Sequence, residues 1–313
     1  MIRARRIALV TAALSLLSAV TIPTPAGAAE PSFLTVQFGR SIEGSYNKIC
    51  GVPVAGIMTL AQVAADLQAR GMVGVGTVVV NRTGTANELC LGGDTYADWP
   101  DLQALYAEGW RFVSDGMTHN NMLTMTPAEQ QAESCGSLPY FAAHGLKSAN
   151  GEFAYGDNKE SATIQNTIVA RCFDFGRKYW AGGVNTYSVM SPPRWLKTQS
   201  ITGGACSTPG QPCYTPTSAQ KGRHYMSPTI LAGMVAAEHG YQWIDLQFYR
   251  LVSGVSTISP AYSWDCSSSD WTRHWTSQTE MYCENDFDTI LNSVPSSTVV
   301  TDPASVYTAW SQS

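Results

Sequence analysis

The sequence lacks several features that would divide the chain or assign it to a common class. It has no Cys-x-x-Cys pair, no internal repeat and no Pro/Ser-rich linker, so neither a common zinc motif nor a chain of separate domains is expected. No second long apolar run follows residue 29, and no retained membrane helix is expected. Basic residues are also few, with 19 Lys and Arg against 24 Asp and Glu. This balance argues against nucleic acid or an anionic membrane as partner.

The first 29 residues have the composition of an export signal. Three arginines precede an apolar run over residues 7–22, and the small residues Ala26-Gly27-Ala28-Ala29 follow. Removing this segment leaves 16 basic residues against the same 24 acidic ones, a net charge of −8. We therefore expect a soluble, secreted, monomeric protein that suits neutral or cationic ligands.

All eight cysteines follow the signal. An even number in an oxidising compartment predicts four disulfides. The spacing favours pairs that are consecutive along the chain, above all Cys206 with Cys213 and Cys266 with Cys283, although the count allows other connectivities.

Helix signals repeatedly precede strand signals. Thr59 and Gln62 form a capping box, and Thr126, Pro127 and Glu129 form another helix start. The expected pairs, in chain order, are a helix ending at Gly71 before a strand at 72–80, a helix at 100–109 before a strand at 110–114, and a helix at 227–240 before a strand at 243–251. This order predicts an α/β fold with a parallel sheet closed or covered by helices, and we prefer a (β/α) barrel. Two irregular segments, 187–225 and 264–283, are expected to be disulfide-pinned loops that help to build a site.

The most informative segment is 108–129, EGWRFVSDGMTHNNMLTMTPAE. A short strand ends in a polar turn that holds Asp115 and His119, and a helix starts at Thr126. This is the layout of a metal-site loop that is short of one ligand.

Over residues 33–295 the chain resembles the polysaccharide deacetylase (NodB-homology) family, and the strongest match is GWRFVSDGMTHNNMLTMTPAEQ, which is similar to the family's second motif. The resemblance implies a distorted (β/α) barrel that hydrolyses acyl amide or ester groups on a glycan, with a divalent metal such as zinc held by one Asp and two His. Residues 296–313 would form a C-terminal tail.

Several family positions are substituted. The first motif falls on LTVQFGRS, with Gly39 in place of the catalytic base and Arg40 in place of the ligand Asp. In the second motif, Asp115 and His119 occupy the two His positions. Arg40 would place a permanent cation where the metal should bind. It could also pair with Glu43, either as a structural replacement for the metal or as an ordinary solvated pair on the surface. The protein could therefore be a pseudoenzyme.

Three residues are candidates for catalysis. Asp115 and His119 could bind a metal weakly or act as a carboxylate–imidazole pair, in which the carboxylate fixes the tautomer of the ring; the alternative is two ordinary turn residues. Tyr249 falls where the family has its acid His, and alternation places it with Asp245 and Gln247 on the face that points into the barrel. A buried structural tyrosine is the alternative.

Aromatic residues suggest where a sugar would bind. Tyr155 falls in the family's aromatic-Pro motif, with Gly156 where the proline is expected, and Trp264, Trp271 and Trp275 crowd one loop. Flat rings beside polar groups suit stacking on sugars, but the same residues could pack a small disulfide-closed lobe.

The sequence thus leaves three functions open. The first is a secreted glycan deacylase of the deacetylase type. The second is a non-catalytic glycan- or cell-wall-binding module on the same fold. The third is a metal-free hydrolase that uses Asp115 and His119.

Overall fold

The computed structural model describes residues 30–39, 56–85, 96–178, 183–192, 194–199, 227–257, 263–270 and 281–312. Four residues named above lie outside this part of the chain: Arg40, Glu43, Trp271 and Trp275. Four of the eight cysteines also lie outside it: Cys50, Cys90, Cys206 and Cys213. The expected signal at 1–29 and most of the expected loop at 187–225 also lie outside it.

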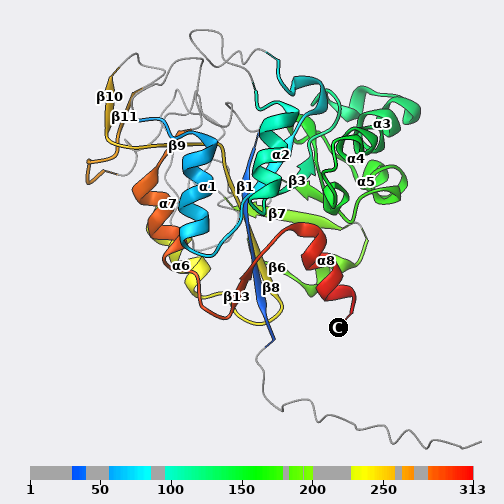
Figure 1. Ribbon diagram of the computed structural model, residues 1–313. Helices are drawn as coiled ribbons and strands as arrows, with labels where there is room; N and C mark the ends of the chain where they lie inside the picture. Colours follow the sequence, from blue (N-terminus) through cyan, green and yellow to red (C-terminus); the bar gives the residue numbers. More distant parts are fainter. Residues whose placement is uncertain are drawn as a thin grey trace, which may run out of the picture.

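A ring of seven parallel strands forms the centre of the molecule (Figure 1). The strands are, in spatial order, β1 (Ser32–Phe38), β2 (Val75–Val78), β3 (Arg111–Ser114), β4 (Glu152–Ala154), β5 (Phe175–Lys178), β7 (Trp195–Gln199) and β8 (Gln242–Phe248). β8 returns to pair with β1 from Phe33↔Trp243 to Phe38↔Phe248. The seam between β3 and β4 is the weakest, with the single register pair Ser114↔Phe153. The sheet is therefore a nearly closed parallel barrel.

Two shorter strands extend this ring, and four others form two separate two-stranded sheets. β13 (Thr298–Val300) pairs in parallel with the first half of β1, and β6 (Asn185–Thr186) pairs antiparallel with β8. β9 (Arg250–Val252) pairs with β12 (Met281–Cys283), and β10 (Val255–Thr257) pairs with β11 (Ser263–Asp265).

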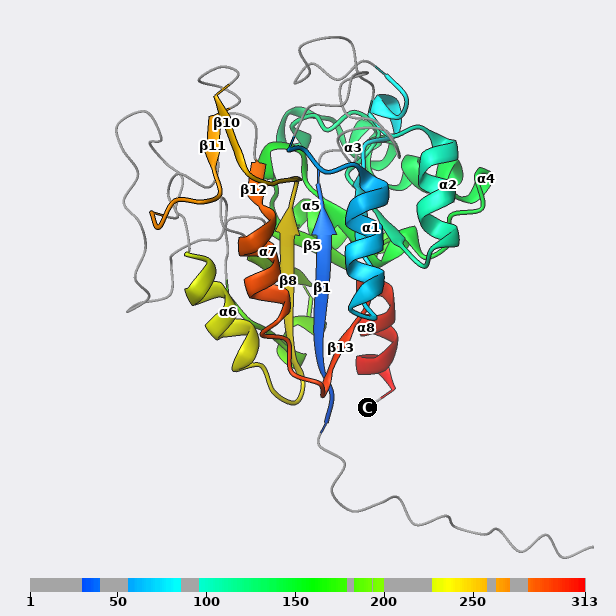
Figure 2. The ribbon, with the colours of Figure 1, turned by 60° about the vertical axis from the view of Figure 1, so that its left-hand side comes forward.

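Helices surround the barrel, as Figures 1 and 2 show. They are α1 (Leu60–Ala69), α2 (Trp99–Ala107), α3 (Pro127–Glu133), α4 (Leu138–Ala143), α5 (Ala162–Thr167), α6 (Pro228–Ala236), α7 (Glu284–Leu291) and α8 (Pro303–Ser311). The predicted (β/α) barrel is thus confirmed. Within the described ranges, no helix has the length and apolar character that crossing a membrane requires.

The helix starts that we predicted from capping boxes are confirmed. Both capping boxes are present, Thr59 with Gln62 on α1 and Thr126 with Glu129 on α3. The predicted strand boundaries were less accurate. The strand expected at 72–80 covers only Val75–Val78, because a 3₁₀ turn begins at Val80. The strand expected at 243–251 is two strands that separate at Tyr249.

The two faces of the barrel strands have different environments. Leu34, Val36 and Phe38 of β1 point outward and pack with α1 in a large apolar core. At the N-terminal end the interior is filled by aromatic and aliphatic side chains, where Trp243 packs edge-on against Trp310 of α8 with ring centroids 5.7 Å apart. The segment 296–313, which we expected to be a C-terminal tail, thus contains a helix, α8 (Pro303–Ser311), that packs against this end of the barrel.

Two disulfides join the described segments. Cys135 is bonded to Cys172, and Cys266 is bonded to Cys283. Both are pairs of consecutive cysteines, as predicted. The second one joins the segment after β11 to the end of β12 and closes part of the loop expected at 264–283.

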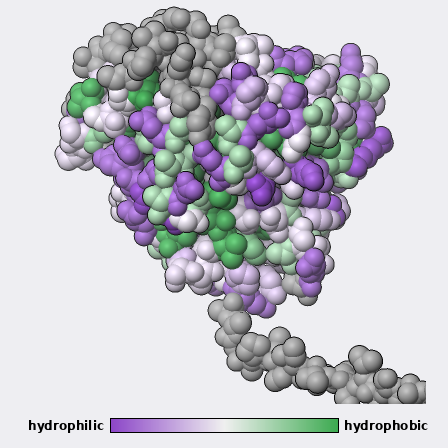
Figure 3. Space-filling model, viewed as in Figure 1, coloured by the Kyte–Doolittle hydropathy of each residue, from purple (hydrophilic) through white to green (hydrophobic). Residues whose placement is uncertain are grey.

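The face of the molecule that Figure 3 shows is chemically mixed where its residues are coloured. On the face in Figure 3, hydrophilic and hydrophobic residues are interspersed. The large hydrophobic side chains that the described residues expose lie on separate elements: Leu123, Tyr140, Tyr187, Val255 and Val299.

Candidate functional site

The interior of the barrel changes from apolar to polar towards the C-terminal ends of the strands. Gln37 Nε2 donates hydrogen bonds to Glu152 Oε2 and Asp245 Oδ1, both at 2.7 Å. Arg177 Nε lies 3.0 Å from Glu152 Oε1. All four side chains are buried. Asp245 thus points into the barrel, as alternation along β8 predicted, while Ile244 and Leu246 join the outer core.

Arg177 supplies the positive charge of this interior. Burial, the largest single cause, lowers its pKa, but Glu152, Asp115, Asp245 and Tyr249 together raise it, and the net shift is upward. Burial raises the pKa of Glu152, against the opposing effects of Arg177 and the Gln37 hydrogen bond. The guanidinium is therefore the counter-ion for acids on three different strands or strand ends.

Asp115 and His119 meet directly after β3. Asp115 N donates to Val78 O at 2.8 Å, which continues the β2–β3 pairing by one residue. Asp115 is buried, and its Oδ1 lies 2.9 Å from Nδ1 of His119, whose side chain is 19% exposed. The pair thus stands at the C-terminal end of a parallel barrel, the end where active sites of such barrels occur. The two residues form the carboxylate–imidazole arrangement that we considered from the sequence; its catalytic role remains a prediction.

Gly39 follows β1 at the same end of the barrel. Its N donates to Phe248 O at 2.8 Å. A Cβ at this position would overlap Nε2 of Gln247 and Cε1 of Tyr249. At the position where the resemblance expects the catalytic-base carboxylate, a side chain would therefore fit only if Gln247 and Tyr249 moved.

Tyr249 is buried beside Gly39, and it raises the pKa of Arg177, so it belongs to the same polar interior. Its candidate role in catalysis remains a prediction.

The two described candidates for sugar stacking are both buried. The Tyr155 hydroxyl donates to Gln165 Oε1, and burial raises the pKa of Tyr155. The Trp264 indole N–H donates to Ser253 O at 3.0 Å. These contacts favour the packing alternative for both residues, since neither ring presents an open face in this structure.

The described residues do not fit a three-ligand metal site. Asp115 and His119 bond to each other, and no group of three His, Cys, Asp or Glu side chains converges within the described ranges. A zinc site in proteins takes at least three such ligands. Arg177 also places a guanidinium near Asp115, which disfavours a second cation there.

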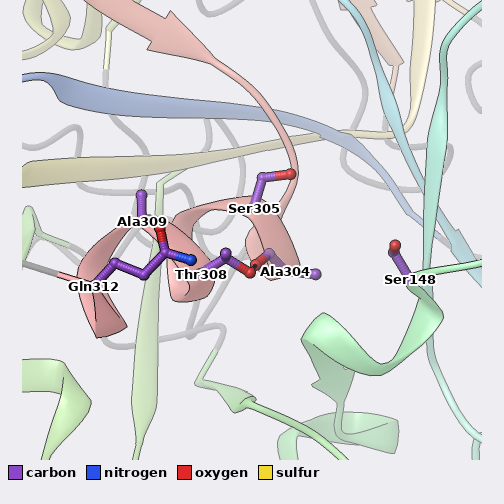
Figure 4. A pocket seen from close by; sticks show the side chains of 6 residues that line it. All are labelled: Ser148, Ala304, Ser305, Thr308, Ala309 and Gln312. Atoms are coloured by element: carbon purple, nitrogen blue, oxygen red, sulfur yellow. Dashed lines mark hydrogen bonds between the residues drawn. The ribbon is translucent and has the colours of Figure 1, made fainter. Parts of the chain in front are cut away.

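A surface hollow lies at the opposite end of the barrel, beside α8 (Figure 4). Its lining is uncharged: Ser148, Ala304, Ser305, Thr308, Ala309 and Gln312. It offers neither a nucleophile activated by a base nor a charged group to orient a ligand.

Some residues of this site were not found from the sequence. Glu152 stands in a short strand between Gly151 and Phe153, and a charge in that position is a signal for a polar barrel interior. Arg177 gives a weaker signal, because the charged residue Lys178 follows it. Glu133, which contacts the Asp115–His119 turn, has no comparable signal, because it is one of many polar residues in α3.

No protein-family model and no curated protein sequence matches the chain. Solved structures that it resembles include a family 4 carbohydrate esterase from Streptomyces lividans, with 10% identity and a TM-score of 0.37 over 70% of this chain and 79% of that chain. The deacetylase PplD from Streptococcus pyogenes shares 14% identity, with a TM-score of 0.37 over 52% of this chain and 61% of that one. IcaB from Ammonifex degensii shares 14% identity, with a TM-score of 0.34 over 50% and 66%. At these values the argument for function depends on the site itself.

Proposed function

We propose that this protein is a secreted, glycan-directed hydrolase that removes an acyl group held as an ester or amide, with His119 as general base and Asp115 as its orienting partner. The observation that carries the proposal is the 2.9 Å contact between His119 Nδ1 and Asp115 Oδ1 at the C-terminal end of the barrel. The segment that resembles the second deacetylase motif is the same segment that forms β3, this turn and α3.

The chemistry follows from the tautomer that this contact favours. A neutral His119 that donates Nδ1–H to Asp115 keeps Nε2 as an acceptor. Nε2 can then take a proton from water while the water oxygen bonds to the acyl carbon. The bond from that carbon to the sugar oxygen or nitrogen breaks, and the leaving atom receives the proton from the imidazolium. General-base assistance of this kind contributes roughly 10²- to 10⁴-fold in rate.

The surroundings support this assignment. Asp115 is buried and lies near Arg177, so a carboxylate at this position has a permanent counter-charge. The His119 side chain remains partly exposed, which contact with a substrate requires. Tyr249 is the candidate donor to the developing negative charge on the acyl oxygen. The export-like N-terminus and the acidic balance suit an extracellular glycan that is neutral or cationic.

A second candidate function is non-catalytic glycan or cell-wall binding. The residue at Gly39 favours it, because the position expected to hold the family's base is a glycine packed against the Gln247 and Tyr249 side chains. This alternative predicts sugar binding without turnover.

The test is acetate release by the mature protein from N-acetylated and O-acetylated oligosaccharides. We expect release that falls to background in His119→Gln. The matched control is His239→Gln, because His239 is exposed after α6 and its Nδ1 lies 3.0 Å from Ala237 O, away from the β3 turn. Equal release by His119→Gln and the wild type would reject the proposal, and sugar binding with no release would favour the second candidate.

A further inference from the structure

Glu133, the last residue of α3, is bonded to the turn that carries His119. Its Oε1 accepts hydrogen bonds from Thr118 N and His119 N, both at 2.9 Å. Its Oε2 accepts from the Thr118 hydroxyl at 2.7 Å, and its backbone oxygen accepts from Met117 N at 3.0 Å. Glu133 is 5% exposed. A buried carboxylate thus binds three donors of one turn at once, and such charge-assisted bonds are among the stronger hydrogen bonds in proteins.

Two glycines allow close contacts on the two sides of this turn: Gly116 next to Glu133, and Gly156 next to the His119 carbonyl. Gly116 has φ +83°, and a Cβ there would overlap Oε1 of Glu133, so the carboxylate approaches only because the residue is glycine. On the other side, the carbonyl of His119 lies against Gly156, where a Cβ would overlap it. The turn is therefore clamped between α3 and the end of β4.

His119 itself has φ +63°, in the left-handed region that residues with a Cβ seldom adopt. Such a conformation persists only where the surroundings enforce it. His119, the residue with the left-handed backbone, donates its N–H to Glu133. Its side chain places Nδ1 next to Asp115.

We infer that Glu133 is a positioning residue for His119. By binding the amides of Thr118 and His119, its carboxylate holds the left-handed turn that brings the imidazole to Asp115 and fixes the Nδ1–H tautomer. This inference rests on the proposed function for its catalytic consequence, but its structural part can be measured without any turnover.

The experiment uses the mature protein with ¹⁵N-labelled histidine, in which ring nitrogen shifts report the tautomer. The His119 signals are assigned from their loss in His119→Gln. We expect the wild type to show the Nδ1–H form, Glu133→Ala to show a mixture of tautomers, and Glu133→Gln to retain the wild-type pattern, because the amide oxygen can still accept both backbone N–H groups. The matched control is Glu129→Ala, since Glu129 is an exposed carboxylate of the same helix that bonds Thr126 and not the turn.

Glu133→Asp keeps the charge but shortens the side chain, so it should show the same mixture of His119 tautomers as Glu133→Ala. If Glu133→Ala does not fold, the ¹⁵N shifts of Glu133→Asp test the inference instead. For acetate release we expect kcat to fall about 10- to 100-fold in Glu133→Asp, with KM changed less than about twofold. An unchanged Nδ1–H pattern in a folded Glu133→Ala or Glu133→Asp would overturn the inference. Wild-type protein that shows the tautomer but releases no acetate would instead reject the proposed function alone.

Discussion

Arg177 Nε lies 3.0 Å from Glu152 Oε1, between neighbouring strands in the middle of the barrel. The two side chains are 5% and 0% exposed. Gln37 extends the contact by donating to both Glu152 and Asp245. The strands of the barrel are thus joined by a buried polar network as well as by backbone pairing, and Arg177 provides the cation of that network.

Arg177→Met should destabilise the protein by about 3–5 kcal/mol, because it leaves Glu152 and its neighbours buried without a counter-ion. Urea unfolding of the purified protein measures this change. Arg171→Met, at an exposed arginine, is the control and should cost little. Adding Glu152→Gln to Arg177→Met should recover part of the loss, and a loss below about 1 kcal/mol in the single variant would show that the network is not needed.

Asp115→Asn should reduce acetate release by roughly 10²-fold or more while KM changes little. An amide in place of the carboxylate can donate to Nδ1, which favours the wrong tautomer of His119 and removes the charge that stabilises the imidazolium. Steady-state kinetics on one accepted oligosaccharide measure the effect. Activity within twofold of the wild type would show that His119 does not depend on Asp115.

Glu238→Gln should stabilise the protein by an amount that grows as the pH rises. Burial raises the pKa of Glu238 to about 8, against the hydrogen bond from Ile244 N, which lowers it. Between its ordinary pKa of 4.5 and this value, the folded protein keeps a proton that the unfolded chain loses. Stability contributed by the protonated side chain is therefore complete below about pH 4.5 and is lost as the pH rises to about 8.

The measurement is urea unfolding of Glu238→Gln and the wild type at acidic, neutral and alkaline pH. Glutamine can still accept the bond from Ile244 N, so that contact is matched. We expect near-equal stabilities at low pH and an advantage of roughly a few kcal/mol for the variant at high pH. An advantage that does not vary with pH would contradict the assignment.

Gly39→Ala should cost about 1–3 kcal/mol, because the added Cβ overlaps Gln247 and Tyr249. Gly233→Ala is the control: this exposed glycine in α6 has no heavy atom within 4 Å of an added Cβ, and the change should be neutral or slightly stabilising. For the same reason, Gly39→Asp should not create zinc binding detectable by calorimetry. Tight, stoichiometric zinc binding by Gly39→Asp would refute our account of this position.

Local signals predicted the parts of the fold that depend on neighbouring residues. The capping boxes at Thr59 and Thr126 need only a partner three residues away, and Cys266 and Cys283 are close enough in sequence for their pairing to be favoured. The end of β8 at Phe248 was not predicted, because the apolar pattern continues through Leu251 and the break is made by pairing with other strands.

The candidate site was predictable only in part for a similar reason. Asp115 and His119 are four residues apart, and a single turn brings them together. Glu152, Arg177 and Asp245 come together only when the strands close into a ring, so their contact depends on long-range pairing. The overlap that a side chain at Gly39 would meet also depends on β8, and sequence spacing does not reveal it.

The most direct test of the central claim is the dependence of acetate release on His119 and on metal. Purified mature protein is assayed on acetylated oligosaccharides before and after dialysis against a strong chelator, with metal content measured on the same samples. The account predicts release that the chelator leaves unchanged and that His119→Gln abolishes. Release that disappears with the chelator and returns with stoichiometric zinc would contradict it.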